Sequence, residues 1–155
     1  MNWQIKAFNE LTLDELYDIL KLRIDVFVVE QTCYYPDLDD LDRHPGTLHV
    51  FGYQDDKIVG YLRILPKGTT YQEYNSIGRV IVSDALRGAG LGHNLIAHGV
   101  KACQEQFREN DIKISAQEHL AKFYQTHGFK QVTDMYLEDD IPHIGMLLSE
   151  AYTSR

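Results

Sequence analysis

Three of the five positions that follow Arg87 are glycine in the stretch VIVSDALRGAGLGHNLI, residues 80–96: Gly88, Gly90 and Gly92. The segment before them is strongly β-prone, and the segment after them has the apolar spacing of a helix. A helix N-terminus leaves backbone N–H groups unpaired and carries partial positive charge. Glycines before it let a ligand approach the backbone closely. This junction therefore predicts an anion site, usually one for phosphate.

The common nucleotide-binding patterns do not match this loop. A P-loop that starts at Gly88 requires Gly and then Lys where this chain has His93 and Asn94. The dinucleotide fingerprint G-x-G-x-x-G fails as well, because its third glycine falls on His93 or on Leu95, depending on where the count starts. The remaining pattern is R-x-x-G-x-G, from Arg87 to Gly92.

Other residues with chemical potential are an acidic run and two cysteines. The run DLDDLD, residues 37–42, fails as a calcium loop because its sixth position is Asp42 and its twelfth is Leu48. We interpret it as a solvated loop or as an acidic rim that attracts a cationic substrate. No His/Cys cluster has zinc spacing, so no metal is expected. Cys33 and Cys103 are too few for a disulfide framework, and Cys103 falls on the apolar face of a helix as a small core residue.

A family resemblance extends beyond the glycine loop. The pattern R-x-x-G-x-G after a strand resembles the [QR]-x-x-G-x-[GA] signature of the GNAT superfamily of acetyl-CoA-dependent N-acetyltransferases. The segment HLAKFYQTHGF, residues 119–129, is similar to the later family segment in which a helix carries a Tyr before xxxGF. LRIDVFVVEQ, IGRVIVSDALRG and DDIPHIGM look like the ElaA-like group. The resemblance covers nearly the whole chain.

The resemblance implies acetyl-CoA as cosubstrate and a set of residues that bind it. In the superfamily the loop amides hold the CoA pyrophosphate, and the backbone of the fourth strand pairs with the pantetheine arm, with one N–H near Val82 polarising the thioester carbonyl. Gln117 stands where many relatives carry an Asn that contacts this arm. Carried over, the cofactor-binding residues are Val80, Ile81, Val82, Arg87, Gly88, Ala89, Gly90, Leu91, Gly92, His93 and Gln117.

Tyr124 occupies the family position of the general acid, which protonates the departing thiolate. The residues alone leave the general base open. The candidates are Glu30, Glu118, His119 and His143, and ordered water does this work in many relatives.

Arg23 begins the pattern R-x-x-V-F, which resembles acyl-homoserine-lactone synthases. In that interpretation Arg23 lines the acceptor site. The alternative is a surface ion pair with Asp14, Asp18 or Asp25.

The elements that must position these residues follow from periodicity. We expect strands at 3–8 and 76–83, a hairpin of 48–54 and 57–65 around two aspartates, a strand at 112–116 and closing strands at 129–139 and 143–152. A helix should begin at a capping box of Thr12 and Glu15, with its β-branched end favouring a departure from helix. Further helices should begin at Leu91 and span 118–127, the latter ended by Gly128. The predicted fold is α+β, a GNAT-type mixed, mostly antiparallel sheet flanked by helices on both faces.

Composition limits the partners. The chain has 155 residues, 44% of them hydrophobic, which fits a single domain over 1–155. A net charge of −8 argues against nucleic acid and is compatible with a cationic partner. No apolar run approaches the ~20 residues of a membrane span, and no secretory signal is visible, so the cytoplasm is expected. A homodimer is expected only from the family.

Three functions remain open from the sequence. The first is transfer of acetyl from acetyl-CoA to the primary amine of a small molecule or protein by direct attack. The second is transfer of a longer acyl group, as in relatives of the acyl-homoserine-lactone synthases. The third is a non-catalytic acyl-CoA-binding module.

Overall fold

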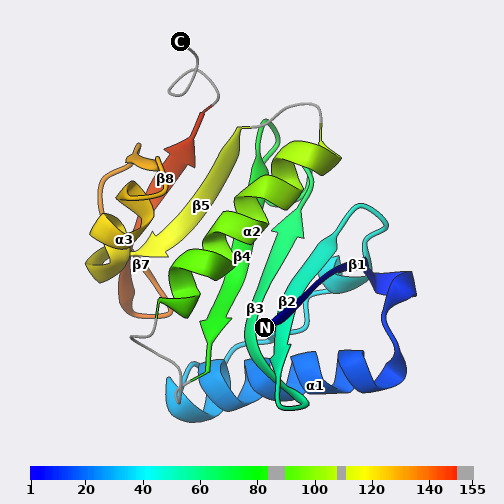
Figure 1. Ribbon diagram of the computed structural model, residues 1–155. Coiled ribbons are helices and arrows are strands. Elements are labelled where there is room, and N and C mark those ends of the chain that lie inside the picture. Colours follow the sequence, from blue (N-terminus) through cyan, green and yellow to red (C-terminus); the bar gives the residue numbers. More distant parts are fainter. Residues whose placement is uncertain (84–89, 108–110, 150–155) are drawn as a thin grey trace.

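The computed structural model describes residues 1–83, 90–107 and 111–149 (Figure 1). Within these ranges an eight-stranded sheet has the order β1-β2-β3-β4-β5-β8-β6, with β7 pairing β8. Only the β4–β5 pair is parallel among the described strands, so the mostly antiparallel sheet is confirmed. The strands are β1 Asn2–Ala7, β2 Leu48–Gln54, β3 Lys57–Leu65, β4 Asn75–Val82, β5 Ile112–Gln117, β6 Lys130–Gln131, β7 Tyr136–Glu138 and β8 Ile141–Leu148.

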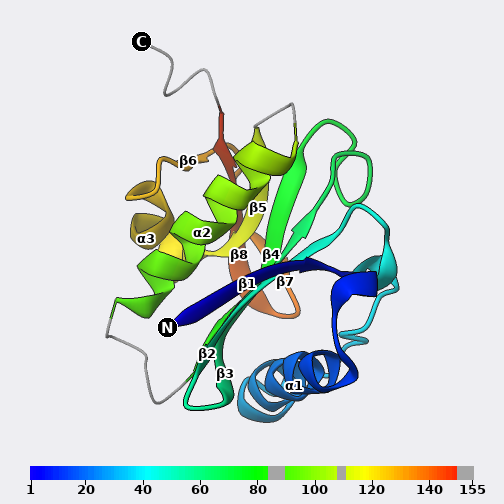
Figure 2. The ribbon, with the colours of Figure 1, turned by 45° about the vertical axis from the view of Figure 1, so that its right-hand side comes forward.

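Helices cover both faces of the sheet, as predicted. Helix α1, Leu13–Arg23, lies on one face, and α2, Leu91–Gln106, lies on the other together with α3, Ala121–Gln125 (Figures 1 and 2). Short 3-10 turns occur at Phe8–Glu10 (η1), Leu41–Arg43 (η3) and Glu118–Leu120 (η5). No helix in the described ranges has the length and apolar character that crossing a membrane requires.

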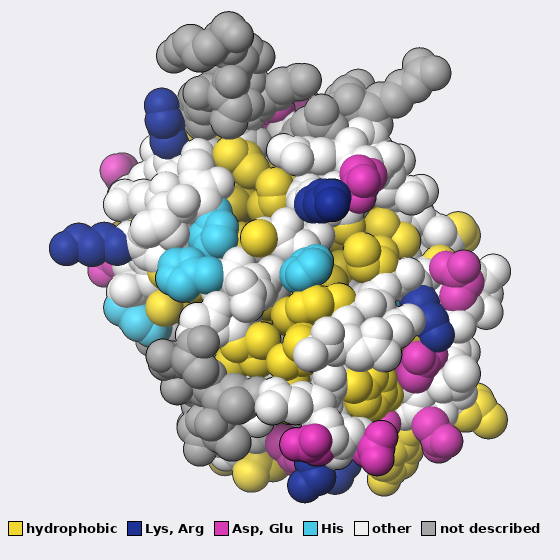
Figure 3. Space-filling model, in the orientation of Figure 1, with side chains coloured by type: hydrophobic (Ala, Val, Ile, Leu, Met, Phe, Trp, Pro, Cys, Tyr) yellow, Lys and Arg dark blue, Asp and Glu magenta, His cyan; other side chains and the backbone are white. Residues whose placement is uncertain are grey.

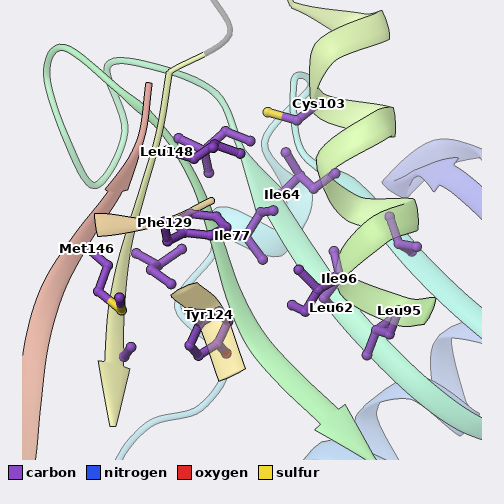
Figure 4. Close-up of a cluster of buried hydrophobic side chains, with 14 of the residues drawn as sticks. Leu62, Ile64, Ile77, Leu95, Ile96, Cys103, Tyr124, Phe129, Met146 and Leu148 are labelled. Atoms are coloured by element: carbon purple, nitrogen blue, oxygen red, sulfur yellow. The ribbon is translucent and has the colours of Figure 1, made fainter. Parts of the chain in front are cut away.

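Two hydrophobic cores lie on the two faces because side chains alternate along the strands. Leu62 and Ile64 of β3 belong to the larger core, under α2 and α3 (Figure 4). Tyr61, directly before Leu62 in β3, points to the other face and belongs to the smaller core with Phe51 and with Ile19 of α1. The two cores together hold the central strands in place.

The end of α1 differs from the prediction. Its capping box is present, with Thr12 Oγ1 accepting from the Glu15 N–H at 3.0 Å. The β-branched segment does not leave the helix; it continues as a π-helix, η2, Ile24–Glu30. β-Branched residues lower helix propensity by only a fraction of a kcal/mol, and the burial of Val26 outweighs that cost. The loop that follows η2 contributes Gln31, Cys33 and Tyr35 to the lining of a cleft in the sheet.

Both tight hairpins turn on two aspartates. Asp55 and Asp56 between β2 and β3 have φ of 52° and 63°, and Asp139 and Asp140 between β7 and β8 have φ of 50° and 62°. Positive φ at both central residues is the requirement of a type I′ turn. The β2–β3 hairpin was predicted. The closing segment 129–139 instead forms two short strands, β6 and β7, and so places an acidic turn at the edge of the sheet.

The parallel pair of strands forms a fork. β4 and β5 pair only at Asn75–Ile112 and Ser76–Lys113 in the described structure. Further along, β4 bulges against β3 at Arg79, whose φ is +53°. A bulge bends its strand and raises the local twist, so β4 turns away from β5 and the two strands separate.

Candidate functional site

A cleft of about 460 Å³ lies in the fork between β4 and β5. Its walls come from these strands, from the segment after η2, from η5 and α3, and from the β7–β8 turn. Among the predicted residues it brings together Val80, Gln117, Tyr124 and His143. These residues are far apart in the sequence and meet because β4, β5, α3 and β8 are neighbours in the fold.

Tyr124 is positioned by a helix end that its own neighbours specify. Gly128, with φ of +93°, ends α3 in a Schellman motif: Phe129 N–H donates to Tyr124 O at 3.2 Å and Gly128 N–H to Gln125 O at 3.0 Å. The Tyr124 ring packs edge-on against Phe129 (Figure 4). Burial raises the pKa of the Tyr124 hydroxyl to about 12. That hydroxyl has no hydrogen-bond partner among the described residues, so it is available to a ligand.

The predicted strand residues divide between cleft and core. Val80 lines the cleft together with Ile77 and Gly78. Ile81 is buried, and Val82 packs half-buried against the larger core. Gln117 ends β5 and lines the cleft, and its register partner on β8 is His143.

The predicted anion site is described only in part, since Arg87, Gly88 and Ala89 lie outside the described residues. Gly90 begins α2 with φ of +79°, in the left-handed region that glycine favours. A Cβ on Gly92 would meet the Phe123 ring at 3.4 Å, so this helix start packs tightly against α3.

Leu91 and His93 take opposite environments in the first turn of α2. Leu91 is buried, whereas His93 is exposed with its Nδ1 3.0 Å from Nε2 of His127. Burial, followed by the neighbouring His93, lowers the pKa of His127. Figure 3 shows histidine side chains interrupting the hydrophobic surface on the face that carries α2.

His143 is the base candidate that lies in the cleft. It is 7% exposed, and its Nδ1 lies 2.8 Å from the carbonyl oxygen of Ile141. Glu30, Glu118 and His119 are exposed and are not among the lining residues of the cleft.

Arg23 takes neither of its expected places. Its side chain is fully buried, with Nε 2.9 Å from Asp37 and Nη1 2.6 Å from Asp42. It therefore does not pair with Asp14, Asp18 or Asp25, and it is not among the residues that line the cleft. The π-helix η2 follows Arg23, and the chain beyond it supplies the two aspartates that pair with the Arg23 guanidinium.

The acidic run is not a solvated loop, because Asp37 and Asp42 are 3% and 6% exposed. Asp37 also pairs with Arg79 at 2.9 Å, and Arg63 pairs with Asp39 and Asp42 at 2.7 and 3.0 Å. Buried charges persist only when they are paired and hydrogen-bonded, and this network alternates its signs.

The arginines control the ionisation of these carboxyl groups. Burial by itself would raise the pKa of Asp42, but hydrogen bonds and positive charge from Arg23 and Arg63 outweigh it and hold that pKa below its usual range. The pKa of Asp39 is lowered in the same way, mainly by Arg63. Asp39, Arg63 and Arg79 line one wall of the cleft. Together with the buried Arg23, Asp37 and Asp42 they form a network of three arginines and three aspartates, whose charges balance.

Several cleft residues were not found from the sequence. Ser115 and Glu138 line the cleft, and Tyr136, which is not among the lining residues, is connected to them. Ser115 Oγ lies within hydrogen-bonding distance of Tyr136 Oη and 3.1 Å from Glu138 Oε1. Glu138 Oε2 lies 3.5 Å from Nε2 of His143. The polar alternation of β5, with Ser115 between two buried residues, and the acidic pair after Glu138 were the available signals.

The chain is similar to known proteins over nearly its whole length. Residues 24–150 match the family model of the acetyltransferase (GNAT) domain. Protein ElaA of Escherichia coli strain K12 is 44% identical over 146 residues, which are 94% of this chain and 95% of that protein. The crystal structure of Escherichia coli ElaA superposes with a TM-score of 0.89 at 42% identity, over 94% of this chain and 97% of that one.

Two further solved structures are similar to this chain. An acyl-CoA N-acyltransferase from Pseudomonas aeruginosa has a TM-score of 0.90 at 42% identity, over 96% of this chain and 100% of that one. The CoA-dependent acyl-homoserine lactone synthase BjaI has a TM-score of 0.78 at 17% identity, over 96% of this chain and 83% of that one, and this likeness concerns the fold alone. The chain therefore belongs to the GNAT acetyltransferase family, in which it is ElaA-like.

Proposed function

We propose that this chain transfers the acetyl group of acetyl-CoA to a primary amine by direct attack. The observation that carries the proposal is the β4–β5 fork, whose cleft is lined by Tyr124, a residue whose hydroxyl has no hydrogen-bond partner in the part of the chain that the structure describes. An extended ligand can enter between two strands that have stopped pairing and bind alongside the backbone of β4. The acceptor is the amine of a small molecule or of a protein.

The donor would bind along α2 and β4. In this proposal the N–H groups of residues 87–93 hold the CoA pyrophosphate at the start of α2. The backbone of Val80–Val82 and the side chain of Gln117 hold the pantetheine arm. An N–H near Val82 then stabilises the negative charge that develops on the thioester oxygen.

The proposed reaction needs one acid and one base. The amine nitrogen attacks the thioester carbon, the C–S bond breaks, and the Tyr124 hydroxyl donates its proton to the departing sulfur. Burial raises the pKa of Tyr124 to about 12, so the phenol is protonated at neutral pH and can act as a donor. We assign His143 as the base, because it is the candidate that lines the cleft with Tyr124.

Calorimetry with acetyl-CoA and a thiol-release assay with a panel of primary amines test this function. We expect Gly90→Glu to abolish acetyl-CoA binding, since it adds a negative charge and a Cβ at the left-handed start of α2. Gly68→Glu is the matched control, because Gly68 has φ of +92° and lies in another loop. Absence of acetyl-CoA binding by the wild-type chain would refute the proposal, and binding without turnover on any amine would favour a non-catalytic module.

A longer acyl donor has one observation in its favour. The cleft wall includes Phe27, Ile77, Ile114 and Ile141, which offer apolar contact to an acyl chain. A thermal-shift series from acetyl-CoA to octanoyl-CoA separates the two donors. Acetyl transfer predicts that stabilisation does not increase with chain length, whereas a longer-chain enzyme shows a maximum at a longer acyl group.

A further inference from the structure

In the cleft, Glu138 and His143 turn two atoms towards each other that both accept hydrogen bonds. The carbonyl oxygen of Ile141 can only accept a hydrogen bond, so the Nδ1 of His143, 2.8 Å away, carries a proton. In the neutral ring Nε2 is then the acceptor, and it lies 3.5 Å from the carboxylate oxygen Oε2 of Glu138. This arrangement has two acceptors and no donor between them.

Neighbouring groups hold Glu138 in this place. Its second oxygen, Oε1, accepts from Ser115 Oγ at 3.1 Å, and the Tyr136 hydroxyl lies within hydrogen-bonding distance of the same Ser115 oxygen. Tyr136 is the register partner of His143, and their rings stack with centroids 6.3 Å apart. Three strands, β5, β7 and β8, thus fix the relative positions of the carboxylate and the imidazole.

The charges of the cleft differ between its two walls. Arg63 and Arg79 are matched by Asp39 and the buried aspartates, so that wall is balanced. Glu138 and Asp139 line the opposite wall, and neither has a Lys or Arg partner among the described residues. An incoming cation is therefore attracted to the wall of Glu138 and not to that of the arginines.

We propose that Glu138 and His143 together bind the acceptor as an ammonium ion and deprotonate it, an inference that rests on the proposed function. The ammonium group donates to Oε2 of Glu138 and to Nε2 of His143. One N–H bond of the ammonium breaks, its proton forms a new bond to Nε2, and the electron pair stays on the amine nitrogen, which attacks the thioester carbon. The nitrogen of the tetrahedral intermediate loses a second proton to solvent water as the C–S bond breaks, and solvent then returns a proton to Tyr124 and takes the proton from Nε2. Glu138 stays ionised and accepts a hydrogen bond from the imidazolium.

The first test needs no turnover. Imidazole ¹⁵N spectra of the wild-type chain should show the neutral His143 protonated on Nδ1, and n-butylammonium chloride should shift the Nε2 signal in a saturable way. Glu138→Gln should weaken this binding at least about tenfold, because it removes the charge from a hydrogen bond. Asp140→Asn is the matched control: it removes one charge from the same turn, it does not line the cleft, and Asn tolerates the φ of 62°.

The second test is the pH profile of thiol release with n-butylamine. At pH 7 Glu138→Gln should lower kcat/KM by about 100-fold without changing KM for acetyl-CoA. The loss should shrink towards pH 10, where an alkylamine is neutral without help. The other titratable groups that face the pair are Tyr71, Tyr136, Asp139 and Cys33. Burial raises the pKa of Tyr71 to about 12, above this range.

The outcomes separate this inference from the proposed function. If n-butylammonium binds and Glu138→Gln weakens it, while acetyl-CoA does not bind, the site for the amine stands and the transfer reaction fails. An unchanged titration in Glu138→Gln, a loss of equal size in Asp140→Asn, or a neutral His143 protonated on Nε2 would each overturn the inference. Equal binding of 1-pentanol, a neutral molecule of similar length, would overturn it as well.

Discussion

The two sides of the cleft that we propose for the acyl donor and for the amine acceptor, here called the donor side and the acceptor side, are built in different ways. On the donor side, Tyr124 is positioned by a helix end that closes within five residues, and α2 starts at a glycine next to the strand it follows. On the acceptor side, Arg79 pairs with Asp37 across 42 residues of sequence, and His143 faces the turn of a hairpin. The first side depends on local backbone geometry and the second on contacts made only in the folded chain.

The two sides also differ in their electrostatics. The surroundings of Tyr124 are apolar and leave its hydroxyl without a partner among the described residues. The acceptor side combines a balanced network of buried ion pairs with a wall that carries uncompensated negative charge. We infer that loss of a charge on the acceptor side affects folding as well as function, whereas substitutions on the donor side can change the chemistry alone.

Arg23→Met should produce the largest loss of stability. Removing one partner of a buried network leaves Asp37 and Asp42 with less compensation, and the free energy of unfolding should fall by about 3–5 kcal/mol. Urea unfolding measures it. Lys21→Met on the same helix removes an exposed pair with Asp25 and should leave that free energy nearly unchanged, because solvent screens the pair. Equal effects of the two substitutions would contradict the structural role of the network.

Tyr124→Phe should separate chemistry from stability on the donor side. We expect kcat to fall by about 100-fold, or roughly 2.7 kcal/mol, with KM for acetyl-CoA nearly unchanged. The free energy of unfolding should stay within about 1 kcal/mol, because the hydroxyl has no hydrogen-bond partner to lose within residues 1–83, 90–107 and 111–149. Thiol release and urea unfolding measure the two quantities. Tyr17→Phe, at an exposed residue of α1, should change neither, and full turnover by Tyr124→Phe would exclude the general-acid role.

Gly128→Ala should destabilise the Schellman motif at the end of α3, which positions Tyr124. Gly128 has φ of +93°, and a Cβ there would meet Leu148 at 3.0 Å. A left-handed residue with a side chain costs about 1–2 kcal/mol, so the thermal midpoint should fall by a few degrees. Gly68→Ala shares the conformation, with φ of +92° and no atom within 4 Å, and should cost less. An equal loss in both variants would show that packing against Leu148 contributes nothing.

Mild acid should change the free energy of unfolding only slightly, and it should act through His49, which is hydrogen-bonded to Asp42 of the buried ion-pair network. Burial lowers the pKa of His49, whose Nε2 donates to the Asp42 carbonyl and whose Nδ1 accepts from the Tyr61 hydroxyl. The unfolded chain then binds more protons below about pH 6.5, so the free energy of unfolding should decrease from pH 7.5 to 5.5. Urea midpoints at the two pH values measure it, and His49→Gln should flatten the dependence. No dependence in the wild type would contradict the buried neutral imidazole.

Stronger acid should act on the carboxylates. The arginines lower the pKa of Asp39 and of Asp42, so their contribution to stability is complete above about pH 3.9 and is lost as the pH falls through their lower folded values. A second drop in the urea midpoint is therefore expected below about pH 3.9. Arg63→Met should remove much of this second drop, because Asp39 and Asp42 both pair with Arg63.

Much of the fold could be predicted because its signals are local. The Thr12–Glu15 capping box, the aspartate turn at Asp55 and the helix end at Gly128 all lie within a few residues of the structure they specify. The continuation of α1 as a π-helix was not predicted, since burial of Val26 outweighs its weak helix propensity. Periodicity describes one segment at a time and does not include such tertiary contacts.

The residues of the candidate site also fall into two groups, those indicated by local motifs and those placed by distant contacts. The positions of Tyr124 and Gln117 in the cleft agree with the resemblance, because those motifs are short and continuous. Arg23 and the run at 37–42 were misplaced, because an acidic stretch is soluble by composition and is buried only where distant arginines pair with it. Glu138 went unnoticed, since nothing near it in the chain indicates that His143 faces it.

By itself, the sequence determined the mixed sheet, the glycine start of α2 and the helix that carries Tyr124. These features depend on φ preferences, caps and apolar periodicity, which act over a few residues. Only the tertiary structure decided that β4 separates from β5, that Arg23 is buried, and that Glu138 faces His143 at 3.5 Å. Strand register and charge pairing join residues that are far apart in the chain, so they are set by the free energy of the whole fold.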